Sequence, residues 1–147
     1  MANAIHNPGV TFDIGAHLKT QRDGAWLRVR LPSGRCLCYL QPQVDAKGQI
    51  SYMGVNQYTR QWARLKTYGG KIVEHCTQAL ARDLMAVNMP EIERQGFDIL
   101  LSIHDELITE TEGNAEHLSA LMSACPPWAP GLPLAAAGFE CSRYRKD

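Results

Sequence analysis

The chain has 147 residues, enough for one domain with an apolar core. Hydrophobic residues make up 45% and charged residues 20%, as in an ordinary globular protein, and the formal net charge is zero. No apolar run is long enough to cross a bilayer, and the start lacks the basic-then-apolar pattern of a signal peptide. We therefore expect a cytoplasmic protein that makes no contact with membranes.

The five cysteines include no CxxC pair, and no second Cys/His pair stands at a spacing suited to zinc. Reduced, structural cysteines are the interpretation that this pattern favours.

Basic and acidic residues are separated along the chain. Between residues 24 and 73 the only acid is Asp45, against eight lysines and arginines, whereas nine acids between residues 83 and 116 accompany only Arg94. This distribution suits a protein that binds phosphates with one part and cations with another. Neutralisation of one half by the other, across a fold or a dimer interface, explains it equally well.

The first elements in chain order are predicted strands. Residues 1–23 show no clear pattern apart from a turn at residues 7–9. Residues 26–31 alternate apolar and basic side chains, residues 32–34 have turn chemistry, and residues 36–40 return as a second strand, so we expect a β-hairpin. Residues 50–55 are a candidate third strand.

A long helix is predicted from Lys71 to Met89, after two glycines and before Pro90, which should end it. Its apolar stripe has helical spacing and contains Ile72, Val73, Cys76, Leu80, Leu84 and Val87. The opposite, polar face contains Lys71, Glu74, His75, Gln78 and Arg82.

The last third of the chain predicts a strand over 97–103, a returning strand over 107–110, a helix over 114–125 and a final strand over 132–140. Together these elements describe an α+β domain. We divide it into a β-rich basic segment, residues 1–66, and a core, residues 67–147, in which antiparallel strands pack on the long helix.

The polar triplet His104, Asp105 and Glu106 lies between two apolar strands. Adjacent carboxylates at a tight turn each raise the pKa of the other unless a cation compensates. Mg²⁺ is suited to that role, because it binds through one or two carboxylates plus substrate phosphates. For a bare tripeptide, an ordinary exposed hairpin turn is the better explanation.

The surroundings of the triplet favour the functional interpretation. Residues 103–107 (IHDEL) closely resemble the HDE motif of family A, DNA polymerase I-like, DNA polymerases, and residues 74–83 (EHCTQALARD) resemble the helix that precedes it. Residues 31–35 (LPSGR), 67–71 (TYGGK) and 143–147 (RYRKD) are similar to the phage and prophage branch. The resemblance covers the chain from about residue 24 onward and implies the C-terminal palm portion of such an enzyme.

The resemblance also implies a mechanism and its residues. Two Mg²⁺ ions bridge the primer 3′-hydroxyl and the triphosphate of an incoming deoxynucleotide, with primer–template DNA as the partner. By resemblance Asp105 is a direct metal ligand, Glu106 supports the metal site, and His104 helps to position the primer terminus.

Three residues of the predicted helix are candidate DNA contacts. Gln78 resembles the family residue that bonds to the minor-groove edge, where all correct base pairs share acceptors. Arg82 and Lys71 share its polar face and are candidates for phosphate contacts. Glu74 stands where cellular members often have asparagine, which puts a template contact there in doubt.

Other motifs of the family have no match in residues 1–147. These are the second catalytic aspartate, in a DYSxIE-like strand, the nucleotide-binding fingers helix and the exonuclease motifs. We therefore predict that this chain alone does not polymerise DNA. A gene fragment, a prophage remnant and one piece of a split polymerase, with a second chain as its partner, all remain open.

Two other functions compete with this one. The first is a non-catalytic module that binds DNA or a polymerase fragment. The second is a metal-dependent phosphohydrolase with His75, His104 and Asp105 as ligands. Between residues 52 and 71, aromatic residues interleave with Arg60, Arg64 and Lys66, a pattern that can bind nucleic acid. We expect Trp62 to be core instead.

Overall fold

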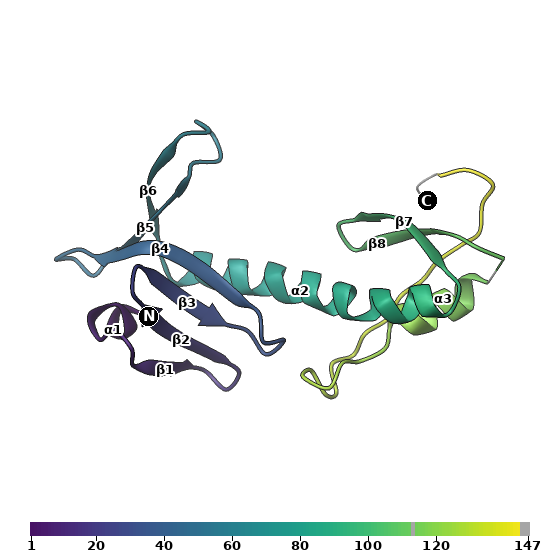
Figure 1. Cartoon of the computed structure of the whole chain (residues 1–147), viewed down its shortest axis with the longest axis horizontal. Helices are drawn as coiled ribbons and strands as arrows, with labels where there is room; N and C mark the ends of the chain where they lie inside the picture. The colour runs from purple at the N-terminus through teal and green to yellow at the C-terminus, as the bar shows by residue number, and fades with distance from the viewer. Residues whose placement is uncertain (113, 145–147) are drawn as a thin grey trace. The chain divides into compact units, whose positions relative to one another are not determined.

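The computed structural model describes residues 1–112 and 114–144 and divides into two compact units. The first unit contains residues 1–80 and the second begins at Ala81, so the boundary falls within helix α2 (Gly69–Arg94). Both units contain antiparallel strands and helix (Figure 1). The α+β mixture expected from the sequence is present.

The first unit contains a six-stranded antiparallel sheet in which each strand pairs with its neighbour in the chain. Its strands are β1 (Thr11–Ile14), β2 (Leu18–Asp23), β3 (Trp26–Arg30), β4 (Cys36–Val44), β5 (Ile50–Val55) and β6 (Trp62–Thr67). The predicted hairpin and third strand are confirmed as β3, β4 and β5. The segment without a clear pattern contains helix α1 (Ala2–His6) and two further strands.

One face of this sheet carries the core of the first unit. Strands alternate their side chains between faces, so Leu27 and Val29 point inward while Arg28 points outward. Helix α1 and the first turns of α2 cover the inward face, and the buried cluster contains Ala4, Ile5, Leu27, Val29, Leu31, Tyr39, Ile72, Cys76 and Ala79. Arg35, in the β3–β4 turn, donates to the Ala79 carbonyl at 2.7 Å and ties the sheet to the helix.

Helix α2 continues through Pro90 to Arg94, so the predicted end at Met89 is wrong. Proline lacks one backbone donor, but the turns around it still form, and the chain leaves the helix only at Gly96, whose φ is 89°. Part of the predicted apolar stripe is also wrong. Val73 and Val87 are exposed, whereas Ala79 and Ile92 are buried.

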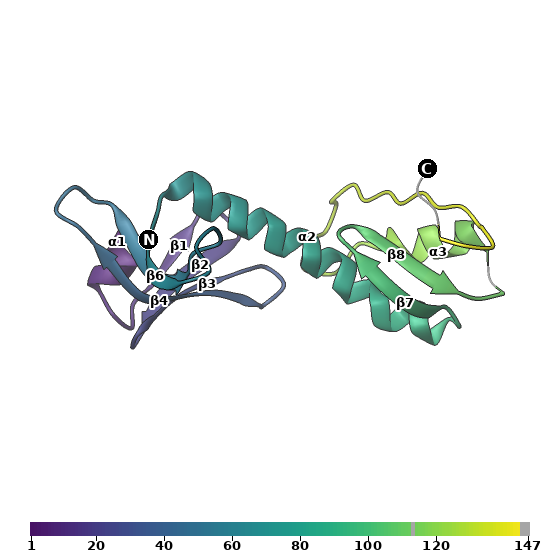
Figure 2. The ribbon, with the colours of Figure 1, turned by 90° about the horizontal axis from the view of Figure 1, so that it is seen from above.

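The second unit contains the hairpin of β7 (Asp98–Ile103) and β8 (Glu106–Glu110) and helix α3 (Ala115–Met122). Figure 2 shows the hairpin alongside the part of α2 that belongs to this unit. Ile92 and Phe97 are its buried apolar side chains, and the Phe97 ring meets His117 of α3 edge to face at 5.4 Å. The Asn88 amide donates to the carbonyls of Met122 and Ala124 at 3.1 and 2.9 Å, which joins α2 to the end of α3.

Two further expectations are corrected. Residues 132–140, predicted as a last strand, adopt neither helix nor strand, because alanine and glycine have low β propensity. Trp62, expected in the core, is exposed. Of the basic C-terminal residues, 145–147 lie outside the described part of the chain.

Among the described residues, no helix combines the length and the apolar character needed to cross a bilayer. All five cysteines are free thiols.

Candidate functional site

The HDE triplet forms the turn of the β7–β8 hairpin. Ile103 pairs with Glu106, so His104 and Asp105 make a two-residue loop between the two strands. His104 has a φ of 53°, the left-handed region that L-residues rarely occupy. Two-residue hairpin loops require a positive φ at their first position, and glycine or asparagine usually provides it. The local chain geometry therefore places a side chain with a Cβ atom in a strained conformation, which Gln41 and Arg60 of the first unit also adopt.

All three side chains of the triplet are exposed. Within residues 1–112 and 114–144, the Asp105 carboxylate has no hydrogen-bond or ion-pair partner, whereas Glu106 is engaged with the protein. The two adjacent acids thus differ: Asp105 is available to a cation, and Glu106 is partly held.

The carboxylates of Asp105 and Glu106 are hard oxygen donors, the type that Mg²⁺ prefers. Among the described residues, no three His, Cys, Asp or Glu side chains converge to hold a metal ion. The turn therefore offers part of a coordination shell, which suits a cation whose other ligands come from substrate phosphates or from another segment.

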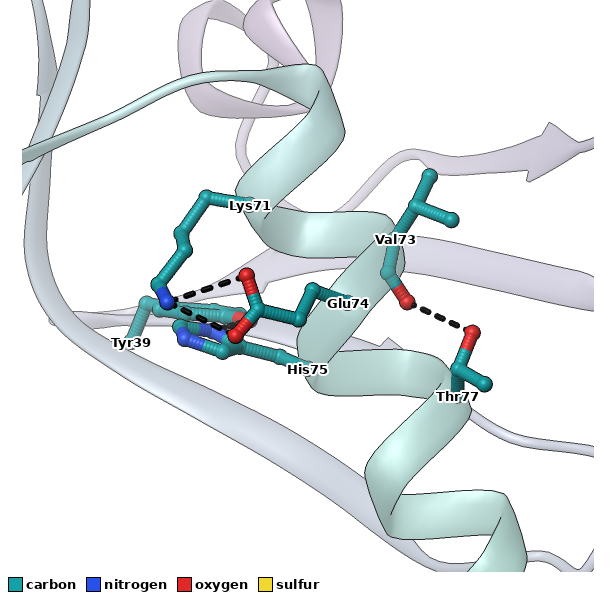
Figure 3. A network of polar contacts seen from close by, with 6 residues as sticks. All are labelled: Tyr39, Lys71, Val73, Glu74, His75 and Thr77. Atoms are coloured by element: carbon teal, nitrogen blue, oxygen red, sulfur yellow. Dashed lines mark hydrogen bonds and ion pairs between the residues drawn. The ribbon is translucent and has the colours of Figure 1, made fainter.

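Lys71 and Glu74 form an ion pair on the first turns of α2 (Figure 3). The Lys71 Nζ lies 2.8 and 3.0 Å from the two carboxylate oxygens of Glu74. This hydrogen bond raises the pKa of Lys71 and lowers the pKa of Glu74. The lysine expected to contact phosphate is thus paired with a carboxylate in the structure.

Gln78 and Arg82 are both exposed on α2. Gln78 belongs to the first unit, and its amide makes no hydrogen bond to the described residues. Arg82 belongs to the second unit, where its Nη1 approaches the Met89 sulfur at 3.8 Å. Both side chains are accessible to a ligand, as their predicted role requires.

His75 is used for packing. Its Nδ1 lies 3.1 Å from the Tyr39 hydroxyl, and the two rings stack with centroids 6.1 Å apart. Burial raises the pKa of Tyr39 well above its usual value. His75 lies in the first unit, while His104 and Asp105 lie in a hairpin turn of the second. The ligand set of the phosphohydrolase alternative is therefore not assembled within either unit.

Sequence reasoning found only part of one surface of the first unit: it noted the cations around Trp62 but not those around Trp26. Trp26 and Trp62 are 40% and 59% exposed on strands β3 and β6, and both strands also carry arginine. The signal was available, because each strand has the pattern tryptophan, arginine and a further cation at alternate positions.

Comparison with known proteins shows that the chain is similar in sequence to a named enzyme. No family model matches it, and no solved structure matches it. Over 129 residues, which cover 82% of this chain, it is 36% identical to the DNA polymerase of Bacillus phage SP02. The chain spans 20% of the length of that protein. It is therefore related in sequence, over most of its own length, to a part of a phage DNA polymerase.

Proposed function

We propose that this chain is the C-terminal palm portion of a family A DNA polymerase, and that its β7–β8 turn supplies one of the carboxylate sites for nucleotidyl transfer. The sequence relation to a phage DNA polymerase supports the reaction class. The HDE triplet at an exposed two-residue turn supports the position of the site.

The observation that carries this proposal is the backbone of His104. A left-handed conformation costs an L-residue about 1–2 kcal/mol, which glycine at the same position would avoid. Strain of this kind concentrates at functional sites, where the side chain is needed despite its cost. Here the strained residue is followed at once by Asp105, whose carboxylate has no partner among the described residues.

In the proposed enzyme Asp105 binds Mg²⁺ directly and Glu106 supports the metal site from the start of β8. A Mg²⁺ ion held by these residues would supply charge neutralisation at the triphosphate and at the primer hydroxyl. His104, exposed at the turn, orients the primer terminus, since correct positioning of reacting groups alone contributes several kcal/mol. Primer–template DNA and deoxynucleoside triphosphates are the substrates.

Exposed residues of α2 bind the duplex. The exposed amide of Gln78 contacts minor-groove acceptors that all correct base pairs share, so it tests pairing without reading sequence. Arg82 and Lys71 contact phosphates. For Lys71 this requires exchange of the Glu74 carboxylate for a phosphate oxygen.

A second aspartate must come from a segment outside the HDE hairpin. Within the described residues, β7 and β8 form a sheet of only two strands, which is marginally stable alone. Leu100 and Leu101 of β7 are exposed. A further strand carrying the second carboxylate would cover this hairpin and complete the metal site, whether it belongs to a longer chain or to a second one.

The test is primer extension with the chain alone and with a polypeptide that carries the remaining polymerase motifs. We expect no extension by the chain alone and Mg²⁺-dependent extension by the mixture. Asp105→Asn should lower that rate by at least about 100-fold, because residues that merely support metal ligands already cost 10- to 100-fold. Asp98→Asn is the matched control, since it removes the same charge at the other end of the hairpin.

A second measurement does not depend on reconstitution. Mn²⁺ added to the isotopically labelled chain should broaden the amide resonances of residues 104–106 first, and Asp105→Asn should remove that effect. Equal broadening in the Asp105→Asn variant, or full extension by that variant, would contradict the proposal.

A further inference from the structure

Within the first unit, the six-stranded sheet has an outward face that neither α1 nor α2 covers. Helix α1 and the first turns of α2 lie on the opposite face, with the core cluster. The register ladder continues the outward face across four strands, from Trp26 through Leu40 and Met53 to Arg64. A bulge in β4 between Leu40 and Gln43 absorbs one residue and keeps both strand pairs in phase.

Strands β3 and β6 present the same side-chain pattern on this face. Each has a tryptophan followed, at alternate positions, by two cations: Trp26, Arg28 and Arg30 on β3, and Trp62, Arg64 and Lys66 on β6. Because side chains at alternate positions share a face, all six project outward. The two strands lie three pairings apart, roughly 14 Å, with opposite directions.

Positive charge dominates the outward face. Its cations are Lys19, Arg28, Arg30, Arg64 and Lys66, and its acids are Asp13 and Asp23. Both acids are already paired, with Lys19 at 3.4 Å and with Arg28 at 3.1 Å. The remaining three cations have no carboxylate partner within residues 1–112 and 114–144.

The Arg64 guanidinium is held in place without losing its charge. Its Nη1 donates to the Gln41 carbonyl at 3.1 Å and to the Ser51 hydroxyl at 3.4 Å. Neither partner is anionic, so the guanidinium keeps its other donors for an anion, and a preorganised fork of this kind suits phosphate.

Two exposed tryptophans on one sheet face are costly unless a ligand covers them, because an indole is among the largest apolar surfaces that a side chain offers. Trp62 is 59% exposed and Trp26 is 40% exposed. Neither is closed off by a helix or loop in the described structure. Aromatic rings among cations form the surface on which unpaired bases stack while the cations neutralise phosphates.

We propose that this outward face binds single-stranded DNA, with bases stacked on Trp62 and Trp26 and phosphates at Arg30, Arg64 and Lys66. The similarity to a phage DNA polymerase favours DNA over RNA as the ligand. The exposed indoles select unpaired strands, because in a duplex the base faces are stacked on one another and only phosphates remain for the protein. The inference goes beyond the proposed catalytic function, since no part of it uses the HDE turn or a metal.

The experiment is fluorescence anisotropy with a labelled oligothymidine of about 12 nucleotides, within the range of known single-strand sites. The full chain is used in EDTA at several salt concentrations. Three neutralised phosphates predict a slope of log K against log salt of about −2 for a single strand. Binding should also quench tryptophan fluorescence, and Trp62→Ala and Trp26→Ala should each weaken it about tenfold or more.

The charge test uses the double variant Arg64→Gln, Lys66→Gln. Loss of two phosphate contacts should reduce the magnitude of the slope of log K against log salt by about 1.4. Arg94→Gln is the matched control, because it removes an exposed arginine of the second unit and should leave binding unchanged. Thermal melting, followed by circular dichroism, must give the same midpoint for each variant as for the parent chain. If Trp62→Ala lowers the midpoint, Trp62→Phe is used in its place.

Three results would overturn the inference. They are duplex binding as tight as oligothymidine binding, tighter binding to oligouridine of the same length, and unchanged affinity in both tryptophan variants. Asp105→Asn keeps the test separate from the catalytic proposal: it should bind oligothymidine normally even where it abolishes extension.

Discussion

The strained turn at His104 makes a prediction about stability that is independent of any catalytic assay. His104 has a φ of 53° and an exposed side chain, so its ring contributes little packing. Replacing it with glycine removes the clash between Cβ and the backbone and should stabilise the hairpin. The same change should impair the proposed positioning of the primer terminus.

The expected gain is the difference between two opposing free energies. Relief of the left-handed conformation contributes about 1–2 kcal/mol. The extra backbone freedom of glycine in the unfolded chain lowers the free energy of unfolding by about 0.5–1 kcal/mol. His104→Gly should therefore raise the free energy of unfolding by up to about 1.5 kcal/mol. His104→Ala keeps Cβ and should bring no gain, while His104→Val, with a branched Cβ, should be the least stable of the three.

Urea unfolding followed by circular dichroism gives the global values, and hydrogen exchange of the β7 and β8 amides gives the local ones. The comparison that decides is glycine against alanine, because these variants differ only in the Cβ atom. If His104→Gly is no more stable than His104→Ala, the turn is not strained and the argument for a functional histidine loses its support.

Three further predictions concern packing and charge. Phe97→Ala should cost about 3–5 kcal/mol by urea unfolding, since the ring is 2% exposed and packs on His117. The pKa of Glu74 is lowered by Lys71, so their ion pair contributes to stability above about pH 4.5 and is lost as the pH falls through the folded value. Glu74→Gln should remove this acid dependence of stability. It should also steepen the slope of log K against log salt for duplex binding by about one, since Lys71 becomes free for phosphate. Burial raises the pKa of Tyr39, so stability should fall above about pH 10 by up to about 1.4 kcal/mol per pH unit, and Tyr39→Phe should remove that loss.

Strands were predictable where their inward positions are apolar. Leu27 and Val29 alternate with arginines and gave β3 its pattern, and the turn residues after it fixed the hairpin. Strand β2 was missed because its inward positions include Thr20 and Arg22, which carry no hydrophobic signal. Thr20 is buried nonetheless, and its hydroxyl has no hydrogen-bond partner among the described residues, so packing by its neighbours determines its position.

The long helix and the aromatic residues were misjudged for opposite reasons. Pro90 was treated as a helix stop, but a proline can lie within a helix whose other turns are intact. Aromatic residues in such a stretch are more often partly buried, which predicts Trp62 in the core, although its neighbours at alternate positions are Arg64 and Lys66. Side chains at alternate positions of a strand share a face, so these two cations indicate the exposed face for Trp62. The HDE bend was predictable because the apolar runs on both sides are short and well bounded; the roles of its residues remain predictions.

The order of strands in the first unit has a consequence for how the chain reaches its native state. Each strand pairs with the one just before it, so every loop that must close is short and its entropic cost is small. Topologies dominated by such local pairings fold faster than those that join distant segments. Strands β1 to β6 can thus assemble one hairpin at a time as they leave the ribosome. The buried residues of α2 follow these strands in the sequence, so they pack last, against a sheet that has already formed.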